Sequence, residues 1–117
     1  MSHGMEIVGY KDRDVLVFRV EGRLDSETCE EVSGQLDSWV EMGETWLVGD
    51  LSDLEYINTF GIRVFLVAHR KLLSRGGSLV LCGLKGTAKE IFGITGVTDM
   101  IPMVASKSDA LEMMQRA

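Results

Sequence analysis

The residues of this sequence that could do chemistry stand near the predicted ends of strands and helices. Asp25, Asp50, Asn58 and Thr59 are polar side chains at such positions. A carboxylate can serve as an acid or a base, and a hydroxyl can act as a nucleophile or accept a phosphate. Catalysis by a hydroxyl needs a base beside it, and no nucleophile–base pair can be assembled from these residues. No group of His, Cys, Asp and Glu has metal-ligand spacing, so we expect no enzyme activity, no metal and no cofactor.

The segment Asn58–Gly61 opens the most hydrophobic predicted helix. Asn58 or Thr59 would be a good N-cap, a role worth about 1 kcal/mol that explains a polar residue there. Two further features favour a hydroxyl displayed at Thr59 for a partner to modify. Phe60 and Val64 lie off the buried stripe of the helix, which predicts an apolar patch beside the hydroxyl. Gly61 leaves the first turn without a side chain, so another backbone or a phosphate could approach closely.

The other polar residues have simpler explanations. Asp25 is expected to be a helix N-cap, with Ser26 as the alternative, and Asp50 an acid exposed at a strand end. His69 lies seven residues beyond Ile62, on the inward-leaning side of its helix. It is expected to be half-buried with one nitrogen hydrogen-bonded, since no nucleophile or base is near it.

Two familiar sites do not fit the sequence. A response-regulator receiver needs an acidic pair after its first strand and a lysine after its fifth, and the turn at Asp12 has only basic neighbours. The segment GLKGT (83–87) lacks the GxxxxGK[ST] spacing of a phosphate-binding loop. It is better explained as a turn that leads into a helix.

Length and composition indicate one ordinary globular domain. The chain has 117 residues, of which 45% are apolar and 26% are charged. Its net charge of −6 comes without a basic run, which argues against a nucleic-acid partner. Residues 1–5, which include MSHG, are expected to be a disordered N-terminus or an expression scar, and 6–117 to form the domain.

The cellular location is predicted to be cytoplasmic. Cys29 and Cys82 lie in apolar-periodic segments without CxxC spacing, as expected of reduced core thiols. No apolar run approaches the roughly 20 residues that span a bilayer, so no membrane insertion is expected. The first residues do not have the layout of a signal peptide.

Hydrophobic periodicity predicts the strands. Segments 6–12 and 14–22 form a hairpin with a turn at Asp12-Arg13, and 45–51 is a short buried strand. Further strands are predicted at 78–83 and 100–105, the last at an edge of the sheet because it contains Pro102.

A period near 3.6 predicts four helices. The first begins after Asp25 or Ser26 and ends at Gly43, and the second runs from Thr59 to about Arg75. The third has capping-box spacing at 87–90 and ends at Gly96, and the fourth begins after Ser106 or Ser108.

The resulting order is β-β-α-β-α-β-α-β-α. Strands that alternate with helices indicate an α/β fold with a mixed, mostly parallel sheet covered by helices. In such sheets, sites lie beyond the carboxyl ends of the strands. We therefore expect the loops 22–26, 50–59 and 83–87 to meet, with Asp25, Asp50, Asn58 and Thr59 on one rim.

Four motifs in this order resemble the STAS domain of bacterial anti-sigma factor antagonists, from residue 6 to the end. Asp50-Leu51-Ser52 followed by residues 56–62, YINTFGI, is similar to the family's signature DLS…[FY]-[IM]-[DN]-S-[ST/A]-G-[LI]. VEGRLD (20–25) is similar to its G-x-[LI]-D loop. GGSLVLCGL and IFGITGVTDMIP are similar to its later strand, helix and edge strand.

The resemblance implies a function in transcription regulation, such as a stress response. The family's antagonists bind an anti-sigma factor, which then releases its sigma factor. That anti-sigma factor is itself a serine/threonine-protein kinase that phosphorylates the antagonist, and a protein phosphatase resets it. By position the phosphorylated residue here is Thr59. Asp25, Asn58 and Gly61 would support the site.

The start of the helix predicted from Thr59 to about Arg75 would form the docking face, with Phe60, Ile62 and Val64 as partner-binding residues. Three positions depart from the family's pattern: Thr59 replaces the commoner serine, Asn58 an aspartate, and Phe60 a small residue. These departures bear on the specificity of the kinase.

Two alternatives stay open: an unphosphorylated STAS scaffold, such as an accessory subunit of a lipid-transport ABC system, and a STAS module that binds a small ligand or nucleotide.

Overall fold

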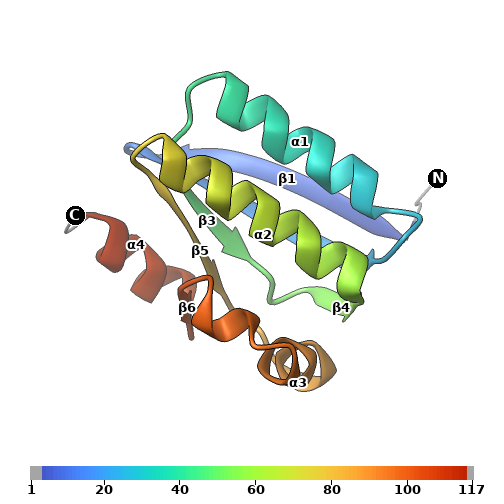
Figure 1. Cartoon of the computed structure of the whole chain (residues 1–117). Coiled ribbons are helices and arrows are strands. Elements are labelled where there is room, and N and C mark those ends of the chain that lie inside the picture. The colour runs from blue at the N-terminus through green and yellow to red at the C-terminus, as the bar shows by residue number, and fades with distance from the viewer. Residues whose placement is uncertain (1–3, 116–117) are drawn as a thin grey trace.

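A mixed β-sheet forms the centre of the fold (Figure 1). The computed structural model describes residues 4–115, and within this range the sheet has six strands. β1 (Met5–Asp12) and β2 (Val15–Leu24) form an antiparallel hairpin. The neighbours that follow are parallel: β3 (Trp46–Asp50), β5 (Ser78–Cys82) and β6 (Met103–Val104). The predicted fold class is confirmed, including the position of β6 at an edge.

The prediction missed one strand, β4 (Leu54–Ile57), which pairs in parallel with the end of β2. β2 has ten residues and β3 only five, so the last part of β2 extends past β3 and needs another partner. Its Gly22 lies beside Leu54 and its Leu24 beside Ile57. The four residues of β4 follow an acidic loop and are too short to show a period, so the sequence indicated only a loop.

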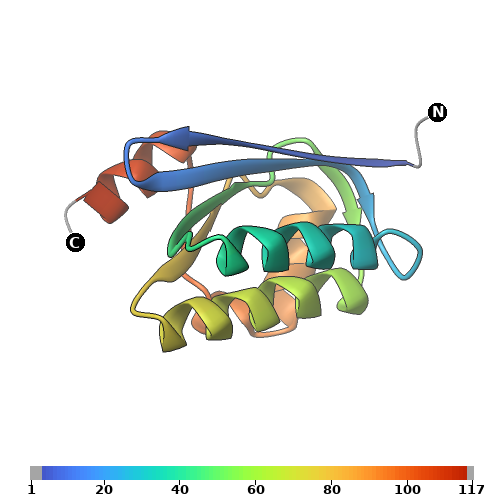
Figure 2. The same ribbon diagram turned by 90° about the horizontal axis from the view of Figure 1, so that it is seen from above.

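Helices cover both faces of the sheet (Figure 2). α1 (Cys29–Glu41) and α2 (Thr59–Ser74) lie side by side on one face, and α3 (Gly86–Ile94) shares their core together with the short 3-10 helix Val97–Asp99. α4 (Lys107–Gln115) covers part of the other face. The alternation in β2 explains the two cores, because Leu16, Phe18 and Val20 point to α1 and α2 while Val15 and Val17 point to α4.

The ends of the elements correct several details of the prediction. The domain begins before residue 6, because β1 starts at Met5, which is buried in the core. Residues 1–3 of the segment predicted to be disordered lie outside the described range. The capping box at 87–90 does not form, since α3 already begins at Gly86 and no side chain caps it. Ser106 is the cap of α4, accepting a hydrogen bond from the Asp109 N–H at 3.1 Å.

The two cysteines differ in their surroundings. Cys82 is a core thiol as predicted, and its pKa is raised to about 11, mainly by burial and then by the negative charge of Asp50. Cys29 is only partly buried at the start of α1, so the prediction of a core thiol is wrong for it. Both are free thiols.

His69 is more buried than the sequence indicated, but it has the predicted role. Its Nδ1 accepts a hydrogen bond from the backbone N–H of Leu79 at 3.1 Å, which joins α2 to β5. Burial holds the pKa of the imidazole below its usual value of 6.5. The folded protein therefore favours the neutral ring.

This pKa shift predicts a loss of stability in mild acid. Above pH 6.5 the ring is neutral in both the folded and the unfolded protein. Below this pH the unfolded chain takes up a proton more readily than the folded chain does, so the free energy of unfolding falls. His69→Asn keeps an acceptor near the Nδ1 position and removes the titration. Urea unfolding at pH 7, 6 and 5 should show a shallower decline for the variant than for the parent. His3 is present in both, so equal declines would contradict this role of His69.

Candidate functional site

The start of α2 presents a hydroxyl that the fold does not use. Asn58 is the N-cap: its Oδ1 accepts hydrogen bonds from the backbone N–H groups of Phe60 at 3.0 Å and Gly61 at 3.4 Å. Thr59, the first helical residue, is exposed, and no hydrogen bond found within residues 4–115 involves its hydroxyl. Of the two cap candidates, the structure therefore selects Asn58 and leaves Thr59 free for another role.

Gly61 faces the interior of the domain and not its surface. It is buried, and a Cβ placed on it would lie 2.7 Å from Leu24 Cγ, 2.8 Å from Ile57 Cγ1 and 2.9 Å from the Leu24 carbonyl oxygen. The expectation that this glycine lets a phosphate or a foreign backbone approach is therefore wrong. Its role is to let the first turn of α2 pack closely on the ends of β2 and β4.

Asp25 organises the loop before α1 and makes no recorded contact with Thr59. Its Oδ1 accepts a hydrogen bond from the Glu27 N–H at 2.9 Å. Thr28, which is buried, is the N-cap position of α1, and its hydroxyl donates to the Arg23 carbonyl at 2.8 Å. The prediction of Asp25 or Ser26 as the cap is therefore wrong. The loop still neighbours the site, because the Asn58 N–H donates to the Leu24 carbonyl at 3.2 Å.

Asp50 does not share a rim with Thr59. Asp50 lies beside Arg19 of β2, whereas Ile57, just before the site, lies beside Leu24. These positions are five residues apart on β2, which is about 16 Å along the strand. The Asp50 carboxylate instead accepts a hydrogen bond from the Ser52 N–H at 3.0 Å. The unpredicted strand β4 thus divides the expected rim into two places.

An apolar groove runs beside Thr59 between α1 and α2. Its volume is about 200 Å³, and it is lined by Cys29, Glu30, Ser33, Phe60, Arg63, Val64 and Val67. Phe60 is 53% exposed, as predicted, whereas Val64 is partly buried and packs against the core. Val67, which is 41% exposed, adds apolar surface that was not predicted. Ile62 is only 4% exposed and packs in the core. It cannot form part of a docking face in the folded domain, which corrects that prediction.

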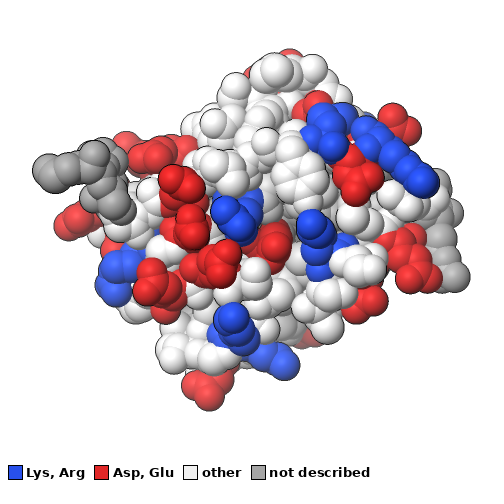
Figure 3. Space-filling model, turned by 180° about the vertical axis from the view of Figure 1, so that it is seen from behind, with Lys and Arg blue, Asp and Glu red and all other residues white. Residues whose placement is uncertain are grey.

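The surroundings of Thr59 favour negative charge. Thr59 stands at the positive end of the α2 dipole, and the first turn of α2 contains no acidic residue. Arg63 is one turn further along, at the i+4 position that neighbours Thr59 on the helix surface, and it is exposed. On the opposite face of the molecule, acidic and basic side chains are interspersed (Figure 3).

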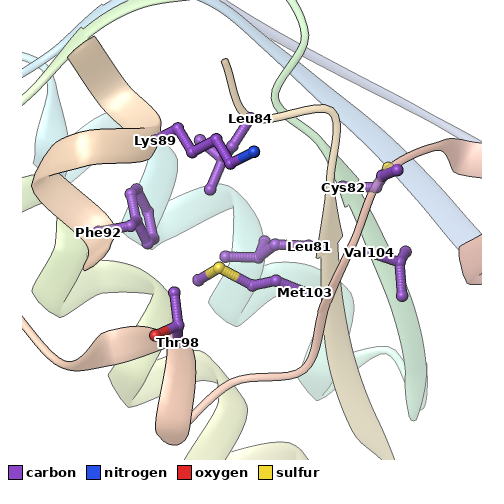
Figure 4. A pocket seen from close by; sticks show the side chains of 9 residues that line it. Leu81, Cys82, Leu84, Lys89, Phe92, Thr98, Met103 and Val104 are labelled. Atoms are coloured by element: carbon purple, nitrogen blue, oxygen red, sulfur yellow. The ribbon is translucent and has the colours of Figure 1, made fainter. Parts of the chain in front are cut away.

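A second pocket, of about 250 Å³, lies beyond the end of β5 (Figure 4). Leu81, Phe92 and Met103 form much of its wall, and Lys89 supplies its cationic group. Such a lining suits an apolar group better than the phosphates of a nucleotide. The pocket shares no lining residue with the groove beside Thr59.

The described residues 4–115 contain neither a metal site nor a membrane-spanning helix. No group of three or more His, Cys, Asp and Glu side chains there could hold a metal ion. No helix within the same range is long and apolar enough to cross a membrane.

The chain is similar to known proteins in both sequence and fold. Residues 6–110 match the family model described as the STAS domain. The chain is 33% identical, over 91% of both chains, to a Bordetella bronchiseptica protein, BtrV, that is named as an anti-sigma factor antagonist. Its fold is similar to that of an anti-sigma factor antagonist from Mycobacterium paratuberculosis, with a TM-score of 0.87, 22% identity and coverage of 95% and 94%.

A further similar structure is that of the Bacillus cell fate determinant SpoIIAA in its phosphorylated form. The TM-score is 0.71 with 19% identity, and the match covers 92% of this chain and 98% of that chain.

The packing of Gly61 predicts the effect of adding one methyl group at the site. Gly61→Ala should lower the free energy of unfolding by about 1–3 kcal/mol, because the added carbon meets Leu24 and Ile57 at less than 3 Å. Gly34→Ala is the matched control, since Gly34 lies in α1 with nothing within 4 Å of its Cβ position. That variant should gain about 0.5–1 kcal/mol from helix propensity. Equal stability of the two variants in urea titrations would show that the close contact is not required.

Proposed function

The chain belongs to the STAS domain family, and we propose that it is an anti-sigma factor antagonist that is switched off by phosphorylation of Thr59. It would bind an anti-sigma factor in the cytoplasm and so free the sigma factor, without an enzymatic activity of its own. The observation that carries the proposal is the division of roles at the start of α2. Asn58 caps the helix end, and the exposed hydroxyl of Thr59 has no hydrogen-bond partner among residues 4–115.

The anti-sigma factor would be of the serine/threonine-protein kinase type, and a protein phosphatase would reverse its action. Such a kinase needs a hydroxyl that can enter its active site. Thr59 meets this condition because it is exposed at the corner between β4 and α2. The named function of BtrV as an anti-sigma factor antagonist supports the class of partner.

A phosphate at Thr59 should leave the fold intact. It would add about −1.5 to −2 charges at neutral pH, at a helix N-terminus that favours negative charge. Arg63 lies one turn away, and its guanidinium could pair with two phosphate oxygens. These contacts stabilise the helix instead of melting it. The signal must therefore act at the surface of the domain.

The groove beside Thr59 supplies that surface. Phe60 and Val67 offer exposed apolar area to a partner, and Val64 lies between them in the lining. A hydrated dianion beside Phe60 would keep water at the centre of the interface and place a charge against apolar groups. Both effects weaken binding, and a loss of about 1.4 kcal/mol is already a tenfold decrease in affinity.

The first test of the proposal is the position of the phosphate. Incubation with the kinase-type anti-sigma factor and Mg-ATP should place one phosphate on Thr59, located by mass spectrometry of proteolytic fragments. Ser52→Ala is the matched control, because Ser52 is the other hydroxyl of the same segment and is partly buried. Its labelling should be unchanged, whereas Thr59→Ala should remove the label. Undiminished labelling of Thr59→Ala would exclude this acceptor.

The second test separates a surface signal from a structural one. Thr59→Glu should keep the circular dichroism spectrum and the thermal midpoint within a few degrees, and should bind the anti-sigma factor at least about tenfold more weakly by calorimetry. Thr87→Glu is the control, since it places the same charge near the start of α3, away from the groove. It should bind like the parent.

Either of two results would contradict this account. Unfolding of Thr59→Glu would mean that the charge acts on the structure. Unchanged binding by a folded Thr59→Glu would leave the groove as a permanent docking face, as in the scaffold alternative.

A further inference from the structure

The two edges of the sheet are protected to different degrees. β6 has only two residues and follows Pro102, and both features limit pairing with a further strand. β1 has eight residues and contains no proline, and its only strand partner within the described residues is β2. A long edge strand without such protection is a template for another strand.

The outer edge of β1 is uncovered. In Figure 2, α1 and α2 lie below the β1–β2 hairpin and α4 lies at its left end, and no helix of residues 4–115 is drawn across the outer edge of β1. The alternation of an antiparallel ladder directs half of the β1 backbone N–H and C=O groups away from β2. On the α4 side of the strand, Val8 is 45% and Tyr10 48% exposed.

Charge is distributed unequally along this strand. Near its start, Glu6, Glu21 and Glu55 line one shallow hollow, and Glu6 and Glu21 are cross-strand neighbours. Near the other end of β1, Lys107 Nζ donates a hydrogen bond to the Tyr10 hydroxyl at 2.7 Å. An antiparallel copy of the strand would place Glu6 near the start of one strand beside Tyr10 and Lys107 near the end of the other.

We propose that two copies of this chain associate through their β1 strands, which pair antiparallel about a two-fold axis at Val8. In such a pair, opposite residues must point to the same face of the joined sheet, so even-numbered residues meet even-numbered ones. Centring on Val8 places Val8 opposite its own copy and Glu6 opposite Tyr10. Lys107, which is hydrogen-bonded to Tyr10, then lies near the partner's Glu6. The two-fold symmetry forms this pair twice in the dimer.

The neighbouring register is less favourable. Centring on Gly9 would place Glu6 opposite Asp12, which brings like charges together twice. It would also separate the Val8 side chains from each other. Apolar contact and charge therefore both favour the axis at Val8.

The dimer would leave the groove and Thr59 accessible. The two-fold axis is perpendicular to the sheet, so the α1 and α2 layers of both copies lie on the same side. The proposal does not rest on the function proposed for Thr59. Pairing of one edge strand buries a small area, so we expect a weak dimer.

The test is the mass of the full chain in solution. Sedimentation equilibrium over a concentration series up to about 1 mM should show the parent approaching twice the chain mass. Val8→Lys should weaken dimerisation at least tenfold, because it sets two lysines opposite each other at the axis. Val67→Lys is the matched control, since Val67 is similarly exposed, at 41%, but lies in the groove. It should dimerise like the parent.

A charge exchange tests the register. Glu6→Lys and Lys107→Glu should each weaken the dimer, and the double variant should restore it, because the cross-copy pair is then re-formed with reversed signs. Circular dichroism would check that each variant is folded.

Three results would overturn the proposal. The parent could remain monomeric throughout the series, Val67→Lys could weaken the dimer in place of Val8→Lys, or the double variant could fail to restore it.

Discussion

The close packing of the first turn of α2 on the ends of β2 and β4 determines the geometry of the candidate site. Gly61 permits it, because no side chain carbon could occupy the space between Leu24 and Ile57. The hydrogen bond from Asn58 to the Leu24 carbonyl fixes the same junction from the strand side. With the helix start held in this way, Thr59 is exposed at the corner and Phe60 borders the groove. Ile62, one residue past the glycine, is buried. One contact thus decides which side chains of the segment are structural and which are available to a partner.

Part of this arrangement could be predicted from the sequence, because it depends on local patterns. The hairpin, α1, α2, β5 and α4 have clear periods, and the structure contains them. The predicted exposure of Phe60 follows from helical period in the same way. The motif YINTFGI made Thr59 the candidate for phosphorylation, which stays a prediction. It could not show which of Asn58 and Thr59 caps the helix, since both residue types are good caps.

The parts that could not be predicted depend on contacts between distant segments. β4 pairs with the part of β2 that extends past the end of β3. The relative lengths of two strands cannot be read from a short stretch of sequence. The inward role of Gly61 depends on Leu24, far away in the chain. The separation of Asp50 from Thr59 follows from β4 in turn. The α1 cap was also mispredicted, because the buried hydroxyl of Thr28 bonds to the Arg23 carbonyl across the loop. Good capping residues at 25 and 26 could not reveal that bond.

The proposed switch at Thr59 and the proposed association through β1 lie at different places on the same sheet. The switch would act through a charge placed beside the α1–α2 groove, whereas β1 lies at the edge of the sheet beyond β2. β2 separates the two places, because it pairs with β1 on one side and with β3 and β4 on the other. A dimer formed through β1 would therefore affect partner binding through valency. The dimer would carry two grooves on one side of the joined sheet, so a partner with two matching surfaces would bind the second groove at a raised effective concentration. Phosphorylation of one copy would remove that gain in affinity without changing the groove of the other copy.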